Sequence, residues 1–157
     1  MRKLKTIEMH RLTVDEFKAA SKLPLVVVLD NVRSLHNVGS VLRSCDAFRV
    51  EAVYLCGITA TPPSAEIHKT ALGAEDSVTW KYFADTTDAV DELHAHATKV
   101  LAVEHVAGST MLQNLQTTEG QRYAVVLGHE VHVVQHAVVD RCAGCLGVTQ
   151  CCTNHSP

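Results

Sequence analysis

Residues 25–48 read LVVVLDNVRSLHNVGSVLRSCDAF and decide the fold class. The run 25–29 is continuously apolar, which is typical of a strand buried on both faces of a parallel sheet. A polar turn follows, and the apolar positions then recur at helical spacing: Val38, Val41, Leu42, Cys45 and Phe48. A buried strand, a turn and an amphipathic helix in this order predict the first unit of an α/β domain.

The same alternation continues on both sides of this stretch. Thr13 and Glu16 have the spacing of a capping box, which predicts a short helix through about residue 22. Apolar runs predict further strands at 52–56, 100–103, 123–127 and 145–148. Helices are expected from Ser64, from Thr86 or Thr87 to about residue 97, and over 133–139. We therefore expect one α/β domain with a mostly parallel sheet covered by helices.

Length and composition agree with a single soluble domain. The chain has 157 residues, of which 46% are hydrophobic and 20% charged, as in an ordinary globular protein. No apolar run approaches the roughly 20 residues that cross a bilayer. The basic N-terminus lacks the apolar stretch of a signal peptide, so we expect a cytoplasmic protein. Residues 1–22 are expected to form a basic extension and helix, and 23–157 the α/β core.

The charge is distributed unevenly along the chain. Residues 1–49 hold nine of the fourteen Lys and Arg but five of the seventeen acidic residues, about +4 within a net charge of −3. A polyanion such as RNA would therefore be drawn to the N-terminal third. A mixed-charge surface without a nucleic-acid partner accounts for the charge alone equally well.

A first polar segment follows the strand 25–29. In parallel sheets, ligands bind beyond the carboxyl ends of the strands. The segment places Asn37 and Gly39 at a helix start, where free backbone N–H groups favour an anion. Arg43 lies six residues beyond Asn37 on the same helix. The structural alternative is that Asn37 caps the helix and Arg43 only solvates its surface.

A second polar segment follows the strand 123–127. Gly128 allows a backbone to approach a ligand closely, and Glu130 would stand at the edge of the sheet. The structural alternative is a turn glycine followed by a surface carboxylate. Because both segments follow buried strands, either could border a ligand site.

Both segments resemble the signatures of the SpoU (TrmH-type) RNA methyltransferases. Residues 30–48 resemble the first signature of that family. Residues 127–132, Leu-Gly-His-Glu-Val-His, resemble the second, with His129 where the family usually has Asn. Residues 68–75 are similar to the segment between them, and the resemblance extends over about residues 5–156.

The resemblance implies a fold, a reaction and a set of site residues. The implied fold is a trefoil-knotted α/β domain that forms a homodimer. The implied reaction transfers a methyl group from S-adenosylmethionine to a ribose 2′-hydroxyl of tRNA or rRNA. Carried over residue by residue, the implied catalytic residues are Asn37, Arg43, Glu130 and Ser156, the cofactor-binding residues are Glu104, Gly128 and Val148, and the RNA-binding residues are Arg33, Arg43 and Arg49.

Residues 148–157 depart from the family's third signature. Thr149 stands where the family has Pro, Cys152 where it has Gly, and Pro157 where it has Leu. The final helix of the family has no counterpart in this sequence. The resemblance therefore predicts an incomplete knot segment and weak cofactor binding. The alternative function is a catalytically impaired RNA-binding relative without a complete cofactor site.

Four of the six cysteines fall near the C-terminal end. Cys142 and Cys145, followed by Cys151, Cys152 and His155, have approximately the spacing of a zinc knuckle. This pattern leaves a zinc-stabilised interaction module open. A reducing compartment favours free thiols instead, and we assign no metal.

Overall fold

The computed structural model describes residues 2–3, 11–129 and 134–149. Within these ranges, seven strands form one sheet in the order β3-β2-β1-β6-β4-β7-β5, with every neighbouring pair parallel. The strands are β1 (Leu23–Asp30), β2 (Val50–Cys56), β3 (Trp80–Phe83), β4 (Lys99–Val103), β5 (Thr110–Met111), β6 (Tyr123–Leu127) and β7 (Gly144–Gly147). The predicted α/β class with a parallel sheet is confirmed.

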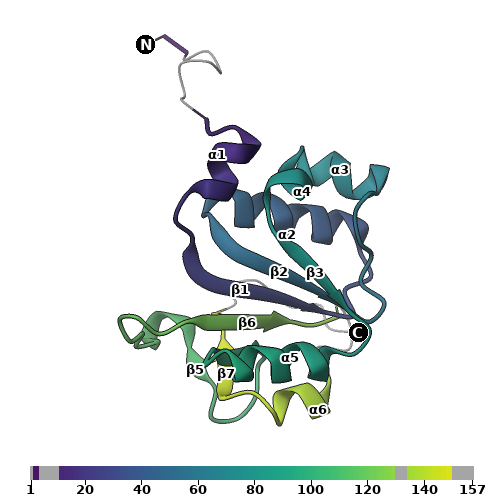
Figure 1. Cartoon of the computed structure of the whole chain (residues 1–157). Helices are drawn as coiled ribbons and strands as arrows, with labels where there is room; N and C mark the ends of the chain where they lie inside the picture. Colours follow the sequence, from purple (N-terminus) through teal and green to yellow (C-terminus); the bar gives the residue numbers. More distant parts are fainter. Residues whose placement is uncertain (1, 4–10, 130–133, 150–157) are drawn as a thin grey trace.

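Helices cover both faces of the sheet (Figure 1). Helices α1 to α4 pack on one face, and α5 and α6 pack on the other. Their bounds are α1 (Val14–Ala19), α2 (Leu35–Ala47), α3 (Ala65–Ala71), α4 (Ala74–Ser77), α5 (Thr86–Ala95) and α6 (His136–Val139), and a 3-10 turn, η2 (Leu112–Asn114), follows β5. The sheet therefore lies between two helical layers.

Strand β1 supplies both layers because its side chains alternate between the faces. Val27 and Leu29 join the core under α2, whereas Val26 and Val28 join the core under α5. All four side chains are buried, which removes each from water and stabilises the fold by roughly 1.5–3 kcal/mol per side chain. The continuous apolar run predicted this double burial.

Several predicted element boundaries differ from the structure. Helix α5 is capped by Asp85, whose carboxylate accepts the Thr87 N–H at 2.8 Å. The expected caps Thr86 and Thr87 were wrong, because the Thr86 hydroxyl donates to Asp30 instead. Helix α6 begins at His136, so the part of the predicted helix at 134–135 is not helical. Strands β3 and β5 and helix α4 were not predicted.

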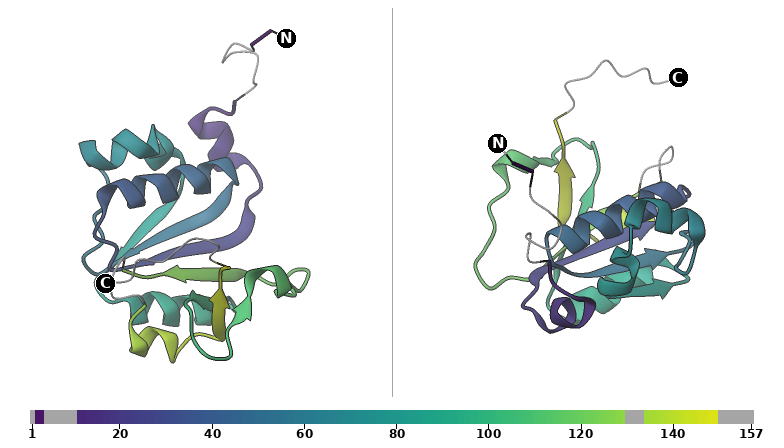
Figure 2. Two further views of the ribbon diagram at one scale, coloured as in Figure 1. Left: turned by 180° about the vertical axis from the view of Figure 1, so that it is seen from behind. Right: turned by 90° about the horizontal axis from the view of Figure 1, so that it is seen from above.

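The sheet is strongly twisted. In the right panel of Figure 2, β7 and β5 are rotated well away from the direction of β1 and β2, as the right-handed twist of parallel strands requires. No helix in the described ranges is both long and apolar enough to cross a membrane. The segment expected to carry the knot falls largely on residues 150–157, which lie outside the described residues.

Candidate functional site

The carboxyl ends of β1 and β6 bring two predicted site residues together. The strands are parallel neighbours, with Leu29 paired to Leu127, so the segments after them leave the sheet at the same edge. A pocket of about 260 Å³ lies there, and Asn37 and Gly128 both line it. Its other lining residues are Leu29, Val32, Ser40, Val41 and Leu127. The first and second polar segments therefore border one pocket.

Helix α2 carries Asn37 in its first turn. The hydroxyl of Ser34 accepts a hydrogen bond from the Asn37 N–H at 3.2 Å and caps the helix. Asn37 thus lies at the helix start, as predicted, but the alternative that Asn37 caps the helix is wrong. Because Ser34 caps the helix, Asn37 is an exposed first-turn residue that lines the pocket.

Gly39 serves the packing of α2 on α3. A Cβ atom at this position would lie 2.1 Å from Thr70 Oγ1 and 2.3 Å from the carbonyl oxygen of Ile67. Only glycine permits this approach, because it has no Cβ. The Thr70 hydroxyl also donates to the carbonyl of His36 at 2.9 Å, across the same interface. The sequence pattern predicted Gly39 at an anion-binding helix start, and the structure places it in a helix–helix contact.

Three predicted cofactor-binding residues follow adjacent strands at this edge. Gly128 follows β6, Glu104 follows β4 and Val148 follows β7, and these strands are consecutive in the sheet. The Glu104 N–H donates to the carbonyl of Leu146 at 3.0 Å, which ties the end of β4 to β7. Residues far apart in sequence thus lie along one edge. Two predicted catalytic residues lie outside the described residues: Glu130 and Ser156.

The Glu104 carboxylate holds the segment that follows β6. Its Oε2 accepts the N–H of Val134 at 3.2 Å, and its Oε1 accepts the N–H of His105 at 3.0 Å. Each carboxylate oxygen can accept a second hydrogen bond. A partly exposed Glu104 can therefore also accept from the ribose hydroxyls or the amino groups of a nucleoside ligand. Such a carboxylate acceptor suits the hydroxyl and amino donors of S-adenosylmethionine, the cofactor implied by the resemblance.

Asp30 is a buried anchor that was not among the predicted site residues. Its carboxylate is fully buried and accepts hydrogen bonds from the Thr86 hydroxyl at 2.6 Å and from the Gln135 N–H at 3.0 Å. It also accepts from the Asn31 side chain at 2.9 Å. Asp30 therefore fixes the start of α5 and the segment before α6 to the end of β1. An acidic residue directly after an apolar run was the available signal in the sequence.

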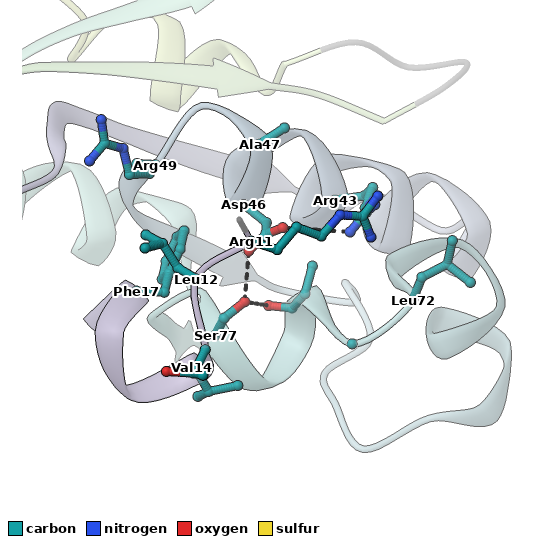
Figure 3. A pocket seen from close by; sticks show the side chains of 13 residues that line it. Arg11, Leu12, Val14, Phe17, Arg43, Asp46, Ala47, Arg49, Leu72 and Ser77 are labelled. Atoms are coloured by element: carbon teal, nitrogen blue, oxygen red, sulfur yellow. Dashed lines mark hydrogen bonds and ion pairs between the residues drawn. The ribbon is translucent and has the colours of Figure 1, made fainter. Parts of the chain in front are cut away.

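Arg43 does not line the pocket of Asn37 and Gly128. Six residues along a helix correspond to about 9 Å of rise and about 240° of rotation, so the side chain of Arg43 leaves α2 elsewhere. It lines a second pocket, of about 500 Å³, formed by residues of α1, α2 and α4 (Figure 3). There its Nη1 lies 3.5 Å from Asp46 Oδ2. One copy of the chain therefore does not bring Arg43 and Asn37 into the same pocket.

The other two predicted RNA-binding residues lie before and after α2. Arg33 is exposed in the turn between β1 and α2. Arg49 is exposed just after α2 and lines the same pocket as Arg43. Arg11, from the basic N-terminal extension, lines this pocket as well. Three of the nine basic residues of the N-terminal third are thus gathered in one place.

The family-like segment 68–75 joins α3 to α4 and holds a polar pair. His68 Nδ1 is hydrogen-bonded to Glu75 Oε1, and Glu75 Oε2 accepts the Gly73 N–H at 2.9 Å. Burial raises the pKa of Glu75, but the hydrogen bonds from His68 and the backbone outweigh it and the pKa is lowered. The pair borders a further pocket of about 580 Å³ next to Trp80.

The cysteines of the described ranges are free thiols: Cys45, Cys56, Cys142 and Cys145. Burial raises the pKa of Cys142 to about 11, so this thiol is protonated at neutral pH. The described ranges contain no group of three or more His, Cys, Asp or Glu that could hold a metal ion. The other residues of the zinc-knuckle pattern lie outside the described residues: Cys151, Cys152 and His155.

Comparison with known proteins identifies related sequences. Residues 24–156 match the family model described as the SpoU rRNA Methylase family. A 23S rRNA (guanosine-2′-O-)-methyltransferase, RlmB, of Nitrosomonas europaea is 42% identical over 72 residues, 46% of this chain and 27% of that protein. RlmB of Coxiella burnetii is 28% identical over 118 residues, 75% of this chain and 46% of that protein. The chain thus spans less than half the length of these relatives.

Solved structures share the fold. An AdoMet-bound rRNA methyltransferase from Sinorhizobium meliloti superposes with a TM-score of 0.77 at 22% identity, over 90% of this chain and 54% of that one. The TrmH/SpoU tRNA modifying enzyme of A. aeolicus superposes with a TM-score of 0.75 at 18% identity, over 90% of this chain and 70% of that one. At these identities the likeness concerns the arrangement of strands and helices.

Proposed function

The chain belongs to the SpoU rRNA Methylase family, and on this premise we propose that it transfers a methyl group from S-adenosylmethionine to a ribose 2′-hydroxyl of tRNA or rRNA. One observation carries the proposal. Residues of the two signatures, Asn37 and Gly128, line a single pocket at the carboxyl edge of the sheet. Glu104 and Val148 follow the next two strands along that edge.

For this reaction the protein must align the methyl donor with the ribose 2′-oxygen and ease the loss of the hydroxyl proton. The cofactor, when bound, supplies a methyl group on an already activated sulfonium. Glu104, Gly128 and Val148 hold it along the strand ends, and Asn37 orients the acceptor ribose. Holding the reacting atoms in line supplies much of the rate enhancement in such transfers. Two further residues complete the proposed catalytic set: Glu130 and Ser156.

Arg43 acts electrostatically in this proposal. A guanidinium keeps its proton to above about pH 12, so Arg43 is a poor general base at neutral pH. It instead clamps an RNA phosphate beside the acceptor ribose and stabilises the negative charge that develops on the 2′-oxygen. Arg33 and Arg49 hold the RNA on either side, within the basic N-terminal third.

The separation of Arg43 from Asn37 supports a homodimer. Because one copy does not place both residues in one pocket, Arg43 of a second copy would complete the site. Mixing Arg43→Ala protein with Asn37→Ala protein should then restore methyl transfer, because some mixed dimers contain one intact site. Each variant alone should be inactive. Failure of the mixture to recover activity, together with a monomer in light scattering, would contradict the dimer.

Incubation with radiolabelled S-adenosylmethionine and unfractionated tRNA or rRNA tests the reaction. Label should appear in RNA, and the modified linkage should resist alkaline hydrolysis because its 2′-oxygen is methylated. Arg43→Ala and Asn37→Ala should abolish labelling, whereas Arg141→Ala, which changes an exposed arginine at the opposite helical layer, should not. Cofactor binding without any transfer to either RNA would contradict the proposal.

The second candidate is a catalytically impaired RNA-binding relative. The departures at Thr149, Cys152 and Pro157 favour it, since they replace residues of restricted backbone or small size in the family's cofactor loop. Calorimetry with S-adenosylmethionine separates the candidates. Heat of binding supports the enzyme, and RNA binding with no cofactor heat supports the relative. In either case we treat 1–157 as one unit, with 1–22 as the basic extension and helix and 23–157 as the core.

A further inference from the structure

A buried threonine joins the segments that follow β1 and β2. Thr59 follows β2, is 3% exposed and does not line the pocket of Asn37 and Gly128. Its Oγ1 accepts the Val32 N–H at 2.9 Å and donates to the Leu29 carbonyl at 3.1 Å. Both of these partners line that pocket. One side chain from another part of the chain therefore holds two backbone groups of the pocket wall.

The Thr59 hydroxyl occupies the place of a hydrogen bond within the turn after β1. Val32 follows Leu29 by three residues, and in a closed β-turn the N–H of the fourth residue donates to the carbonyl of the first. Here the hydroxyl bridges these two groups and bonds to each. Both are buried with their residues, and a buried polar group without a partner costs free energy. The hydroxyl therefore fixes the spacing across the turn and the place of Val32 in the pocket wall.

A second link joins the same two segments. Asn31 has a φ of 55°, in the left-handed region that asparagine tolerates better than most residues. Its Oδ1 accepts the Ile58 N–H at 3.1 Å, and its Nδ2 donates to Asp30 at 2.9 Å. A Cβ atom at Gly57 would lie 2.1 Å from Asn31 Oδ1, so this approach requires glycine. The two segments are thus held together in both directions, by a side chain from each.

The Thr59 link lies on the acceptor side of the proposed site. Val32 leads into Ser34, which caps α2, and so into Asn37 in the first turn of that helix. The proposed cofactor-binding residues follow β6, β4 and β7, which lie on the other side of β1 from β2. A change in the Thr59 link would therefore reach Asn37 more directly than the cofactor edge.

We propose that Thr59 is a positioning residue for methyl transfer. Its hydroxyl sets the place of Val32 and of the start of α2, and thereby the place of Asn37 relative to Gly128. The inference rests on the proposed function, in which Asn37 orients the acceptor ribose. Thr59 acts through these residues and touches neither substrate nor cofactor.

Thr59→Val tests the role, because it keeps the shape of the side chain and removes the hydroxyl. With S-adenosylmethionine and unfractionated tRNA or rRNA, kcat should fall about tenfold, since transfer depends on alignment, whereas the calorimetric Kd of the cofactor should change less than about twofold. Thr59→Ser retains the hydroxyl and should recover most of the rate.

Thr98→Val is the matched control. Thr98 is 4% exposed, and its hydroxyl accepts from Arg122 Nη1 at 3.2 Å just before β4, at the amino edge of the sheet. The variant removes an equally buried hydroxyl far from the proposed site. It should lower the melting temperature about as much as Thr59→Val does and leave kcat unchanged.

Hydrogen exchange followed by NMR tests the link without any ligand. The Val32 N–H should exchange at least about tenfold faster in Thr59→Val than in the unsubstituted protein, because its acceptor is gone. The side-chain amide signal of Asn37 should shift in the same variant. Thr59→Ser should restore both values, and Thr98→Val should change neither.

Each outcome decides the proposal. A lower kcat in Thr59→Val, with recovery in Thr59→Ser and none of the loss in Thr98→Val, supports it. Equal losses of kcat in Thr59→Val and Thr98→Val would mean a merely structural threonine and would overturn it, as would a loss of cofactor affinity as large as the loss of kcat. Absence of transfer by the unsubstituted protein would sink the proposed reaction. The exchange of Val32 and the Asn37 signal would then decide the positioning role, which unchanged values in Thr59→Val would overturn and restored values in Thr59→Ser would support.

Discussion

The two faces of the sheet are held to their helices by different forces. On the face of α1 to α4, the core is apolar and the packing is close, and α2 meets α3 at Gly39 with no room for a Cβ atom. On the face of α5 and α6, buried apolar side chains are supplemented by carboxylates. Asp30 and Glu104 reach from strand ends to Thr86, Val134 and Gln135.

The two faces position different parts of the proposed site. The close-packed face gives a rigid helix α2, which displays Asn37 in one pocket and Arg43 in another. The face with the carboxylate anchors fixes Val134 and Gln135 beside the strand ends at which the cofactor is proposed to bind. A buried backbone N–H group needs a hydrogen-bond acceptor, and apolar packing supplies none. A carboxylate supplies a strong one, so it can hold a non-helical segment in place. We therefore expect substitutions on the two faces to change stability and ligand binding by different amounts.

The largest effect is expected at the close-packed face. Gly39→Ala should lower the free energy of unfolding by about 3 kcal/mol, because the new methyl group overlaps Thr70 and the Ile67 carbonyl. Urea denaturation measures the loss. Ser40→Ala, one residue further at an exposed position of α2, is the control and should change stability by less than about 0.5 kcal/mol. Equal stability of both variants would show that α3 moves aside freely.

A smaller loss is expected at the anchored face. Asp30→Asn keeps the size of the side chain but replaces one acceptor oxygen with a donor that faces the Thr86 hydroxyl or the Gln135 N–H. Leaving one buried group unsatisfied should cost about 2 kcal/mol in urea denaturation. Glu119→Gln, in an exposed loop, provides the control. An Asp30→Asn protein as stable as this control would mean that the carboxylate is not an anchor.

Glu104 should separate binding from stability. Glu104→Gln removes the charge of an acceptor that both positions Val134 and faces the proposed cofactor edge. We expect S-adenosylmethionine affinity, measured by calorimetry, to fall about tenfold, which corresponds to about 1.4 kcal/mol. The free energy of unfolding should change by less than this, since Glu104 is only partly buried. A stability loss with unchanged affinity would restrict Glu104 to a structural role.

The smallest expected effect is a loss of stability at alkaline pH, and it should be alike on the two faces. Burial raises the pKa of Cys45, on one face, and of Cys56, on the other, to about 12. A thiol of the unfolded chain ionises near pH 9.0, whereas the same thiol in the folded protein stays protonated up to about pH 12. Ionisation therefore stabilises the unfolded state alone between these values, and the free energy of unfolding should fall as the pH rises from about 9 to about 12.

Paired variants test this point. The stability cost of Cys45→Ala and of Cys56→Ala, taken relative to the unsubstituted protein at each pH, should shrink over that interval. Both costs should shrink alike, because burial is the main cause at each site. Thermal melts at several pH values measure it. A pH-independent cost at either position would show that its thiol ionises in the folded protein as readily as in the unfolded chain.

The sequence predicted the elements whose signal is local. The strands β1, β2 and β6 are apolar runs, and the capping box of Thr13 and Glu16 is present as expected. Strand β3 was missed because Lys81 interrupts a short edge strand of aromatic residues. The expected start of α6 was wrong where Val134 and Gln135 give their N–H groups to distant carboxylates.

The candidate site was likewise predictable only where adjacent strands determine its position. Adjacent parallel strands place Asn37 and Gly128 at one edge, and the alternation of apolar runs already implied such an edge. The anchoring by Asp30 was not predictable, because its partners Thr86 and Gln135 lie 56 and 105 residues away in sequence. The distance between Arg43 and Asn37 follows from helix geometry, but the pocket that Arg43 shares with Arg11 depends on how α1 packs.

The central position of β6 has a consequence for how the chain acquires its structure. β1 pairs with β2, formed soon after it, and with β6, whose residues lie about a hundred positions later in the chain. Until Tyr123 and its neighbours leave the ribosome, β1 remains an open edge that exposes unpaired backbone groups. Non-local pairing of this kind closes slowly. Synthesis of this chain therefore passes through a stage in which the strand that leads into the first signature is available to wrong partners, and a chaperone that shields strand edges would act at that stage.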